Sequence, residues 1–167
     1  MVDDLLLIGG AVIDGTGAAP RPDTPVLLSG GRITSLGADA VTQAGSDVTT
    51  IDCAGKTVMP GLIDSHLHCT FDDVQSNDEL FFHRDQTMVA LTTAQNLQKI
   101  LRAGVTSFVD PDTTFGVGPS IRDAIEAGVI PGPRMRTGVQ ALLTTVGGTA
   151  GRLIPEEGTV GYAQIVN

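Results

Sequence analysis

Two histidines separated by a single residue are the chain's clearest candidates for chemistry. They are His66 and His68, two of the three histidines among 167 residues. On a β-strand, residues two apart face the same side with Cα atoms about 6.6 Å apart, so both imidazoles can converge on one ion. Neutral imidazole nitrogen suits Zn²⁺ and similar divalent ions. The spacing therefore predicts a metal-binding pair near the end of a strand.

Asp64 precedes this pair and would share its face of the strand. Its carboxylate could accept a ring N–H and orient one imidazole, as carboxylates do beside metal-bound histidines. A buried structural hydrogen bond explains the same residue equally well. Because an H-x-H pair alone is a weak signal, the surrounding sequence has to decide between a metal site and two structural histidines.

The first sixty residues alternate short apolar runs with glycine turns, a pattern typical of antiparallel strands joined by hairpins. Glycine pairs such as Gly9-Gly10 and Gly30-Gly31 tolerate the positive φ angles of tight hairpin turns. A polar stretch over 39–47 connects the second hairpin to the third. The predicted strand pairs are 5–8 with 11–13, 26–28 with 33–36, and 48–51 with 57–59.

From residue 62 onward, strand-like and helix-like segments alternate, which indicates βα units and a parallel sheet. We therefore expect two domains, 1–61 and 62–167. In the second domain, the periodicity predicts a helix over 87–103 that stops at Gly104, followed by a strand over 105–109. The expected apolar face of this helix comprises Ala90, Leu91, Ala94, Leu97, Ile100 and Leu101.

A second βα unit should follow this strand. Ser120 and Asp123 fit a variant of the capping box and would open a helix over 121–127. A third strand is then expected over 135–143, running into a glycine-rich loop over 147–151.

Composition excludes several classes of protein. The chain is 41% hydrophobic and 17% charged, with a net charge of −9 and a pI near 4.5, so a phosphate backbone would be repelled. No apolar run approaches the roughly 20 residues of a spanning helix, and the acidic N-terminus does not resemble a secretory signal. We expect a cytoplasmic protein that binds neither nucleic acid nor membranes. Cys53 and Cys69 form no C-x-x-C motif and are expected to be buried thiols.

The passage over 58–68, Val-Met-Pro-Gly-Leu-Ile-Asp-Ser-His-Leu-His, resembles the first barrel strand of the amidohydrolase superfamily of metal-dependent hydrolases. The segments 101–107 and 121–134 extend the resemblance and are similar to its imidazolonepropionase and prolidase-like branch. Gly31-Arg32-Ile33 followed by Leu36-Gly37 resembles the small β-sandwich that family members build beside the barrel. The resemblance thus implies an α/β fold, the N-terminal part of a TIM (β/α)₈ barrel preceded by a small β-sandwich.

For activity, the resemblance implies hydrolysis of an amide or other C–N bond in a cyclic amide, a dipeptide or an N-acyl compound. His66 and His68 would bind one or two divalent ions, Zn²⁺ being the expected metal, and a metal-activated hydroxide would attack the carbonyl. Family members add a carboxylated lysine in binuclear enzymes, two further histidines and an aspartate from later strands. None of these can be placed in this sequence, so Asp64 is the one further residue considered near the metal.

The length limits how much of such a barrel is present. A TIM barrel needs about 250 residues, whereas 101 residues follow His66, enough for roughly three βα units. We expect the C-terminal remainder, as a second chain or a missing segment, to complete the barrel in an oligomeric assembly. A cloned fragment is the simpler alternative.

Several residues and functions stay open. His83 suits a helix surface or cap better than metal binding, Lys99 suits a solvated helix face, and Asp110 suits a substrate contact or a turn equally well. Thr149 stands after Gly147-Gly148 where related enzymes often carry a histidine. The alternative function is a non-catalytic assembly or scaffold subunit derived from such a hydrolase. Decarboxylation or phosphoester hydrolysis at the same kind of metal site is a third.

Overall fold

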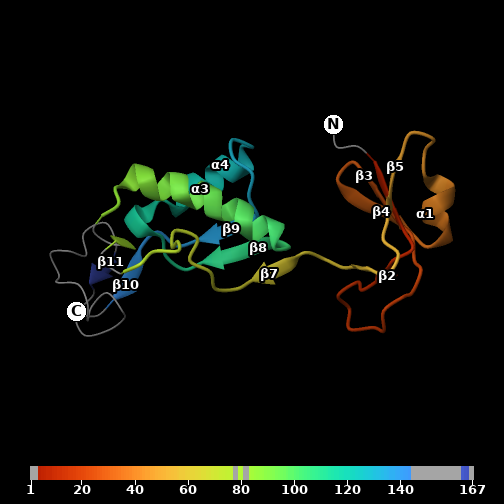
Figure 1. The fold of residues 1–167 in the computed structure, drawn as a ribbon, viewed down its shortest axis with the longest axis horizontal. Helices are drawn as coiled ribbons and strands as arrows, with labels where there is room; N and C mark the ends of the chain where they lie inside the picture. The colour runs from red at the N-terminus through yellow and green to blue at the C-terminus, as the bar shows by residue number, and fades with distance from the viewer. Residues whose placement is uncertain (1–3, 77–78, 81–82, 144–162, 166–167) are drawn as a thin grey trace. The chain divides into compact units, whose positions relative to one another are not determined.

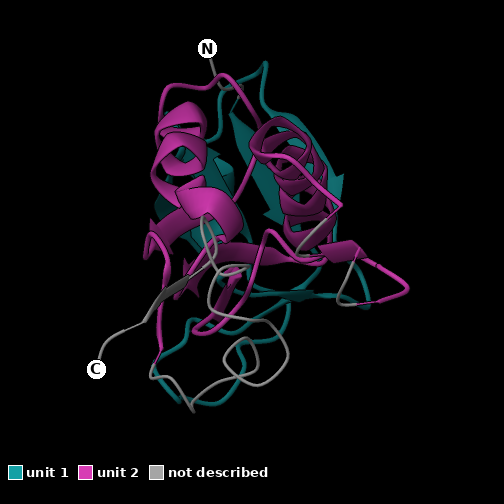
Figure 2. Ribbon diagram, turned by 90° about the vertical axis from the view of Figure 1, so that its left-hand side faces the viewer, with its two compact units in different colours: residues 1–60 teal, residues 61–167 magenta. Residues whose placement is uncertain are grey.

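The structure is a computed structural model that describes residues 4–76, 79–80, 83–143 and 163–165. The chain divides into two compact units, residues 1–60 and residues 61–167 (Figure 2). The predicted glycine loop over 147–151, with Thr149, lies outside the described residues. Within the described part, no helix combines the length and the apolarity needed to cross a membrane.

Unit 1 contains a mixed four-stranded sheet in the order β4-β3-β1-β5, together with a two-stranded parallel pair, β2 and β6. In the larger sheet β1 is antiparallel to β3 and parallel to β5. A short helix, α1, contacts β3 and β4 (Figure 1). The elements are β1 Leu5–Ile8, β2 Ala11–Val12, β3 Val26–Ser29, β4 Arg32–Leu36, α1 Ala38–Gln43, β5 Thr49–Asp52 and β6 Thr57–Val58.

One of the three predicted hairpins is confirmed, because β3 and β4 pair antiparallel across Gly30-Gly31. The other two are wrong, since β1 lies between β3 and β5 instead of pairing with β2, and β6 pairs with β2 instead of β5. At Gly10 the glycine serves a close approach instead of a hairpin turn: an added Cβ would lie 2.9 Å from Cβ of Cys53.

The polar stretch over 39–47, in which no helix was predicted, overlaps the short helix α1, which begins at Ala38. Ala40 is fully buried against Leu6 and Leu27 in the core of unit 1. A single small apolar residue thus anchors this helix, and one residue leaves no periodic pattern for sequence reasoning to detect.

Unit 2 is built on three parallel strands in the order β7-β8-β9, with α3 and α4 on one face of the sheet (Figure 1). The predicted parallel sheet with βα connections is confirmed. A second parallel pair, β10 and β11, follows. The elements are β7 Leu62–Asp64, α3 Gln86–Arg102, β8 Val105–Asp110, the 3₁₀ turn η1 Thr114–Gly116, α4 Gly118–Glu126, β9 Arg134–Thr137, β10 Ala141–Leu143 and β11 Ala163–Ile165.

The core of unit 2 lies between this sheet and its two helices. Phe108 of β8 and Met135 of β9 are paired neighbours, and both are buried beneath the helices. α3 contributes Val89 and Leu97, and α4 contributes Ile121. Burial of these five side chains fixes the helices on the sheet through the hydrophobic effect.

Local sequence signals set both ends of α3. Asp85 caps its N-terminus by accepting a hydrogen bond from the Met88 amide at 2.8 Å. At its other end Gly104 adopts a φ of +89°, a left-handed conformation that suits glycine. The predicted helix is therefore confirmed to within one residue at each end.

The predicted apolar face of α3 is partly wrong. Leu91 is 65% exposed, and Leu101 lies on the exposed side as well. Two polar residues, Thr93 and Asn96, are buried in their place. Their side chains form hydrogen bonds inside the fold, so their burial costs little free energy. A prediction based on hydrophobicity alone therefore misses them on the buried face of the helix.

Two further predictions in this unit are wrong. α4 begins at Gly118, so Ser120 lies inside the helix and cannot serve as its N-cap. Asp123 instead pairs with the Arg122 guanidinium at 2.7 Å. The single strand expected over 135–143 is split into β9 and β10 at Gly138.

Two leucines of α3 provide a matched test of this packing. Leu97→Ala removes a fully buried side chain and should lower the free energy of unfolding by about 2–5 kcal/mol. Leu91→Ala makes the same change on the exposed side, where we expect an effect within about 0.5 kcal/mol. Urea denaturation of both variants measures the difference, and equal losses would contradict the observed orientation of the helix.

Candidate metal centre

The carboxyl ends of β7, β8 and β9 meet at one edge of the parallel sheet. The segment after β7 carries His66 and His68, and the segment after β8 carries Asp112. Beyond the end of β7, the Leu67 amide still donates to the Val109 carbonyl at 3.0 Å. The histidines are therefore held beside the end of β8.

The sequence predicted the two histidines within a strand, near its end. In the structure they lie just beyond the end of β7. β7 ends at Asp64, whose Oδ1 accepts a hydrogen bond from the His66 amide at 3.1 Å and turns the chain. The two imidazole rings nevertheless approach each other edge to face, with centroids 5.1 Å apart and an interplanar angle of 80°. The loop thus brings the two rings together by a local turn instead of a strand pleat.

Asp64 contacts the main chain of this loop through the hydrogen bond to the His66 amide. The sequence left two roles open for Asp64, orienting an imidazole ring or forming a structural hydrogen bond. The hydrogen bond to the His66 amide is of the structural kind. It positions His66 by fixing the backbone, whereas orientation of an imidazole ring by Asp64 stays a prediction.

His68 has three well-defined neighbours. Phe71 stacks on its ring with centroids 4.8 Å apart and an interplanar angle of 12°, while His66 meets it edge-on. Its Nδ1 atom lies 3.3 Å from Oδ1 of Asp112, and the two side chains are 27% and 19% exposed. Nδ1 is buried, and within the described residues it makes no hydrogen bond of good geometry.

A buried carboxylate links the two loops at this edge. Asp110, at the end of β8, accepts the Cys69 amide at 2.9 Å and the Asp112 amide at 3.1 Å. It is fully buried, and this desolvation raises the pKa of its carboxyl group. The residue acts in a turn, which was one of its two predicted roles, and it also holds the residue that follows His68.

Three more polar side chains, those of Thr70, Asn96 and Thr114, hold the loop after β7 that carries the histidines. Asn96 of α3 donates to the carbonyls of Cys69 and Phe71 at 3.1 and 2.8 Å. Thr70 accepts the Thr114 amide at 3.3 Å, and the two threonine hydroxyls are also 3.3 Å apart. We call Thr70, Asn96, Asp110 and Thr114 the polar clamp.

Sequence reasoning missed most of the polar clamp. Thr70, Asn96 and Thr114 carry no motif, and they are recognisable only because buried polar groups need partners. One signal was available: Asn96 lies seven residues after the buried Val89, a spacing that places it on the inward side of the helix.

The remaining candidates lie elsewhere. His83 is exposed and precedes Asp85, the residue that caps α3. Lys99 is largely exposed and forms an ion pair with Asp72 at 3.4 Å. The hydrogen bond from the Asp73 amide, with a contribution from Lys99, lowers the pKa of Asp72.

Both cysteines are buried and unpaired as thiols, as predicted. Burial also raises the pKa of the Cys69 thiol. Cys69 is therefore not poised as a thiolate ligand or nucleophile.

The geometry fits part of a metal site. The edge-to-face rings and the buried Nδ1 of His68 suit a pair of imidazole ligands. Among the described residues, however, no group of three or more His, Cys, Asp or Glu side chains is arranged to hold an ion. The described residues supply two candidate ligands.

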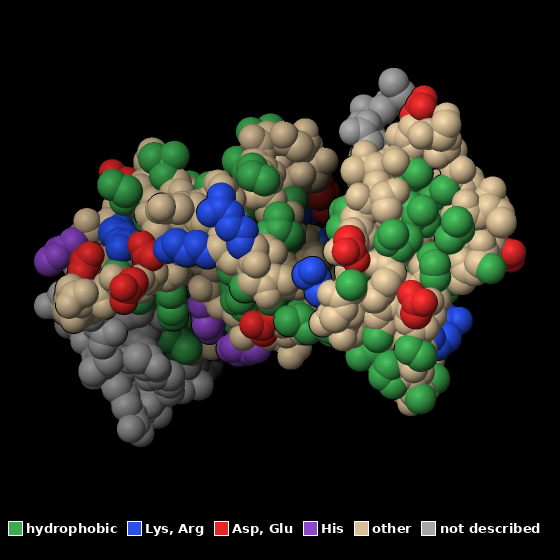
Figure 3. All heavy atoms as spheres, turned by 45° about the vertical axis from the view of Figure 1, so that its right-hand side comes forward, with side chains coloured by type: hydrophobic (Ala, Val, Ile, Leu, Met, Phe, Trp, Pro, Cys, Tyr) green, Lys and Arg blue, Asp and Glu red, His purple; other side chains and the backbone are tan. Residues whose placement is uncertain are grey.

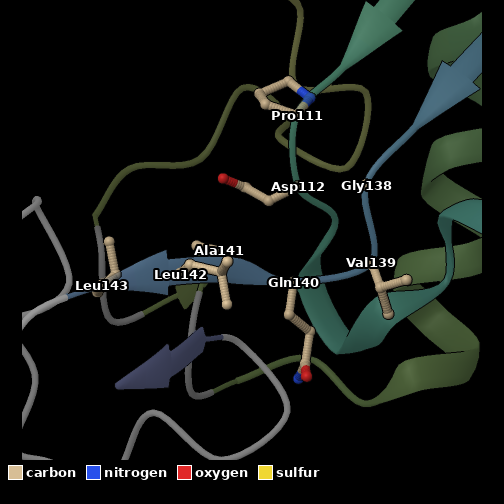
Figure 4. Close-up of a pocket in the computed structure, with 8 residues that line it drawn as sticks. All are labelled: Pro111, Asp112, Gly138, Val139, Gln140, Ala141, Leu142 and Leu143. Carbon is tan, nitrogen blue, oxygen red and sulfur yellow. The ribbon is translucent and has the colours of Figure 1, made fainter. Parts of the chain in front are cut away.

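A cavity of about 780 Å³ lies at the same edge of the sheet. Asp112, whose Oδ1 lies 3.3 Å from Nδ1 of His68, forms part of its wall, whereas neither histidine lines it. Figure 4 shows that the segments after β8 and β9 and the strand β10 surround it. The lining residues are Pro111, Asp112, Gly138, Val139, Gln140, Ala141, Leu142 and Leu143.

Comparison with known proteins decides the family. A family model described as the amidohydrolase family matches residues 57–155, more than half of the chain. The chain belongs to the amidohydrolase family. The matched region contains the histidine pair, the whole parallel sheet and both of its helices, so the resemblance inferred from residues 58–68 is confirmed.

Several proteins share parts of this amidohydrolase chain. It is 30% identical over 102 residues to the enamidase of Eubacterium barkeri, covering 60% of the chain and 23% of that enzyme. It is 32% identical over 77 residues to the imidazolonepropionase of a Polaromonas species, covering 46% of the chain and 18% of that enzyme. A solved prolidase complexed with N-methylphosphonate-L-proline is 27% identical, with a TM-score of 0.73, over 98% of the chain and 40% of that protein.

These coverages show that the amidohydrolase chain spans less than a quarter of either curated relative. The mixed α/β fold is shared with the solved prolidase along nearly the whole chain.

A glycine at the end of β9 offers a test of how tightly this edge is packed. A Cβ at Gly138 would collide with the Pro111 carbonyl, whereas one at Gly45 would meet nothing within 4 Å. Gly138→Ala should therefore separate the ends of β8 and β9 and lower the free energy of unfolding by about 1–3 kcal/mol. Gly45→Ala is the matched control, expected within about 0.5 kcal/mol. Chemical denaturation of both variants decides, and a neutral Gly138→Ala would refute the close approach.

Proposed function

We propose that this chain is the N-terminal segment of a metal-dependent amidohydrolase that hydrolyses an amide or other C–N bond. The observation that carries the proposal is the pair of converging imidazoles, His66 and His68, at the carboxyl edge of a parallel sheet in a chain of this family. Active sites of (β/α)₈ barrels lie at that edge. The proposal accordingly identifies unit 2 as the first part of such a barrel and residues 1–61 as a small β-sandwich.

The relatives support the class of reaction. An enamidase, an imidazolonepropionase and a prolidase are each similar to part or most of the chain. We infer a small-molecule substrate with a cyclic amide, dipeptide or N-acyl group. The cavity beside Asp112 is the place for it, because Asp112 both lines the cavity and faces His68.

In this proposal His66 and His68 are the chain's metal ligands, and Zn²⁺ is the expected ion, in one or two copies. When bound, such an ion supplies hydroxide at neutral pH by lowering the pKa of water to about 7, and it polarises a carbonyl. The chain's own residues position the ligands: Asp64 holds the His66 amide, and the polar clamp holds the residues after His68.

We propose that further polypeptide completes this site, because the described residues supply two candidate ligands. Two histidines do not fill the coordination sphere of a catalytic zinc ion, which has three protein ligands as a rule. The sheet face opposite α3 and α4 also carries Ile63, 74% exposed, and Val109, 40% exposed. Unit 1 exposes Ile33 and Met59 in addition, and Figure 3 shows hydrophobic side chains at the surface of the molecule.

Such exposed apolar surface is typical of an interface with another polypeptide. We therefore propose that the C-terminal remainder of the barrel, in the same gene product or in a second chain, covers it and adds the missing ligands. A non-catalytic scaffold subunit is the competing function, because the described residues contain no third ligand.

Metal analysis tests the proposed centre. The protein, purified with everything that accompanies it, should hold about one or two divalent ions per assembly. The double variant His66→Ala/His68→Ala should lose them, because it removes both proposed ligands. His83→Ala is the control, since His83 is exposed and lies apart in sequence from the pair. Elemental analysis measures the ions, and full retention of metal by the double variant would refute the proposal.

The companion polypeptide can be tested directly by mass. Intact-mass spectrometry of the native assembly should reveal a further segment or chain whose sequence supplies histidines and an aspartate, because the proposed site needs those ligands. A folded, active protein consisting of the 167-residue chain alone would contradict this requirement. A stable assembly without metal or hydrolase activity would favour the scaffold function.

A further inference from the structure

We propose that Asp112 positions the imidazole of His68 for metal binding by accepting a hydrogen bond from its Nδ1–H. The inference rests on the proposed function, and it names a residue that neither the histidine motif nor the sequence analysis singled out. Asp112 acts through His68 and is therefore a positioning residue. The evidence is the set of contacts around the ring.

The surroundings of His68 decide which of its two ring nitrogens is free to bind a metal. Nδ1 is buried and lies 3.3 Å from Oδ1 of Asp112, the one described acidic group within ion-pair distance of it. A buried ring nitrogen without a hydrogen bond is costly, and a carboxylate at this distance is the natural acceptor after a small ring rotation. With Nδ1 protonated toward Asp112, the lone pair of Nε2 remains for a metal.

The His68 ring has little room to change its orientation. Phe71 stacks against His68 and His66 meets it edge-on, so two neighbours restrict tilting of the imidazole. Asp112 distinguishes the two ring nitrogens, because its Oδ1 faces Nδ1 and a carboxylate oxygen accepts a hydrogen bond from an N–H.

Asp112 is itself held in place through its backbone amide. Its amide donates to Oδ1 of Asp110, while Oδ2 of Asp110 accepts the Cys69 amide. One buried carboxylate therefore fixes the backbone on both sides of the contact between His68 and Asp112. This shared anchor sets the distance between the two loops independently of their exposed side chains.

A metal titration separates this role from a general structural one. In the assembled protein, Asp112→Ala should weaken Zn²⁺ binding by about 10- to 100-fold, the usual effect of removing a carboxylate behind a ligating histidine. Asp112→Asn keeps an acceptor without the charge and should fall between Asp112→Ala and the unchanged protein. Asp73→Ala removes an exposed carboxylate from the same unit and should bind Zn²⁺ within twofold of the unchanged protein.

Isothermal titration calorimetry with Zn²⁺ alone measures these affinities. Binding by Asp112→Ala within twofold of the unchanged protein would overturn the inference while leaving the proposed function intact. Failure of the unchanged protein to bind Zn²⁺ would overturn both, and the His66→Ala/His68→Ala result identifies that case separately.

The tautomer of His68 provides a second measurement that needs no variant and is insensitive to folding defects. Nitrogen-15 NMR of the metal-free protein, at a pH where imidazole is neutral, should show His68 with its proton on Nδ1. A proton on Nε2 would contradict the role of Asp112 whatever the variants do.

Discussion

The candidate site depends on one buried carboxylate, that of Asp110. It ends the central strand of the parallel sheet and accepts one amide from each of two loops. One loop carries His68 and the other carries Asp112. Because burial disfavours the charged form of Asp110, the two amide hydrogen bonds are what make its location acceptable. The same bonds place the two loops at a defined spacing.

The polar clamp extends this constraint into the helical layer. Asn96 lies on the buried side of α3, yet its side chain reaches out to the carbonyls of Cys69 and Phe71. The helix that packs the core therefore also holds the loop after the histidines. Satisfied buried polar groups give a segment a unique conformation, which a purely apolar contact would not specify as sharply. The hydrogen bonds of the polar clamp lie at the edge of the sheet that carries the candidate site.

Sequence reasoning succeeded where the information was local. The helix α3 was predictable from its periodicity and from Gly104, and the strand β8 from its β-branched and aromatic residues. It failed where partners are distant in the chain: the hairpin expected after Gly9-Gly10 is absent because β5, some forty residues later, occupies the edge of β1. Short strands such as β2 likewise take their partners from the whole unit instead of their neighbours.

The same distinction explains what could be predicted of the site. His66 and His68 are two residues apart, so the convergence of their rings depends on a few backbone angles. The rings converge even though the two residues lie just after β7 and not within it. Asp110 ends a different strand, β8, and Asp112 follows it, more than forty residues later in the chain. The parallel pairing of β7 and β8 brings them near the histidines. A histidine pair encoded locally can thus be recognised from sequence, whereas the acidic groups beside it depend on the assembled sheet. Under the proposed function, the same logic applies to the further ligands, which strands of the companion polypeptide would bring to this edge.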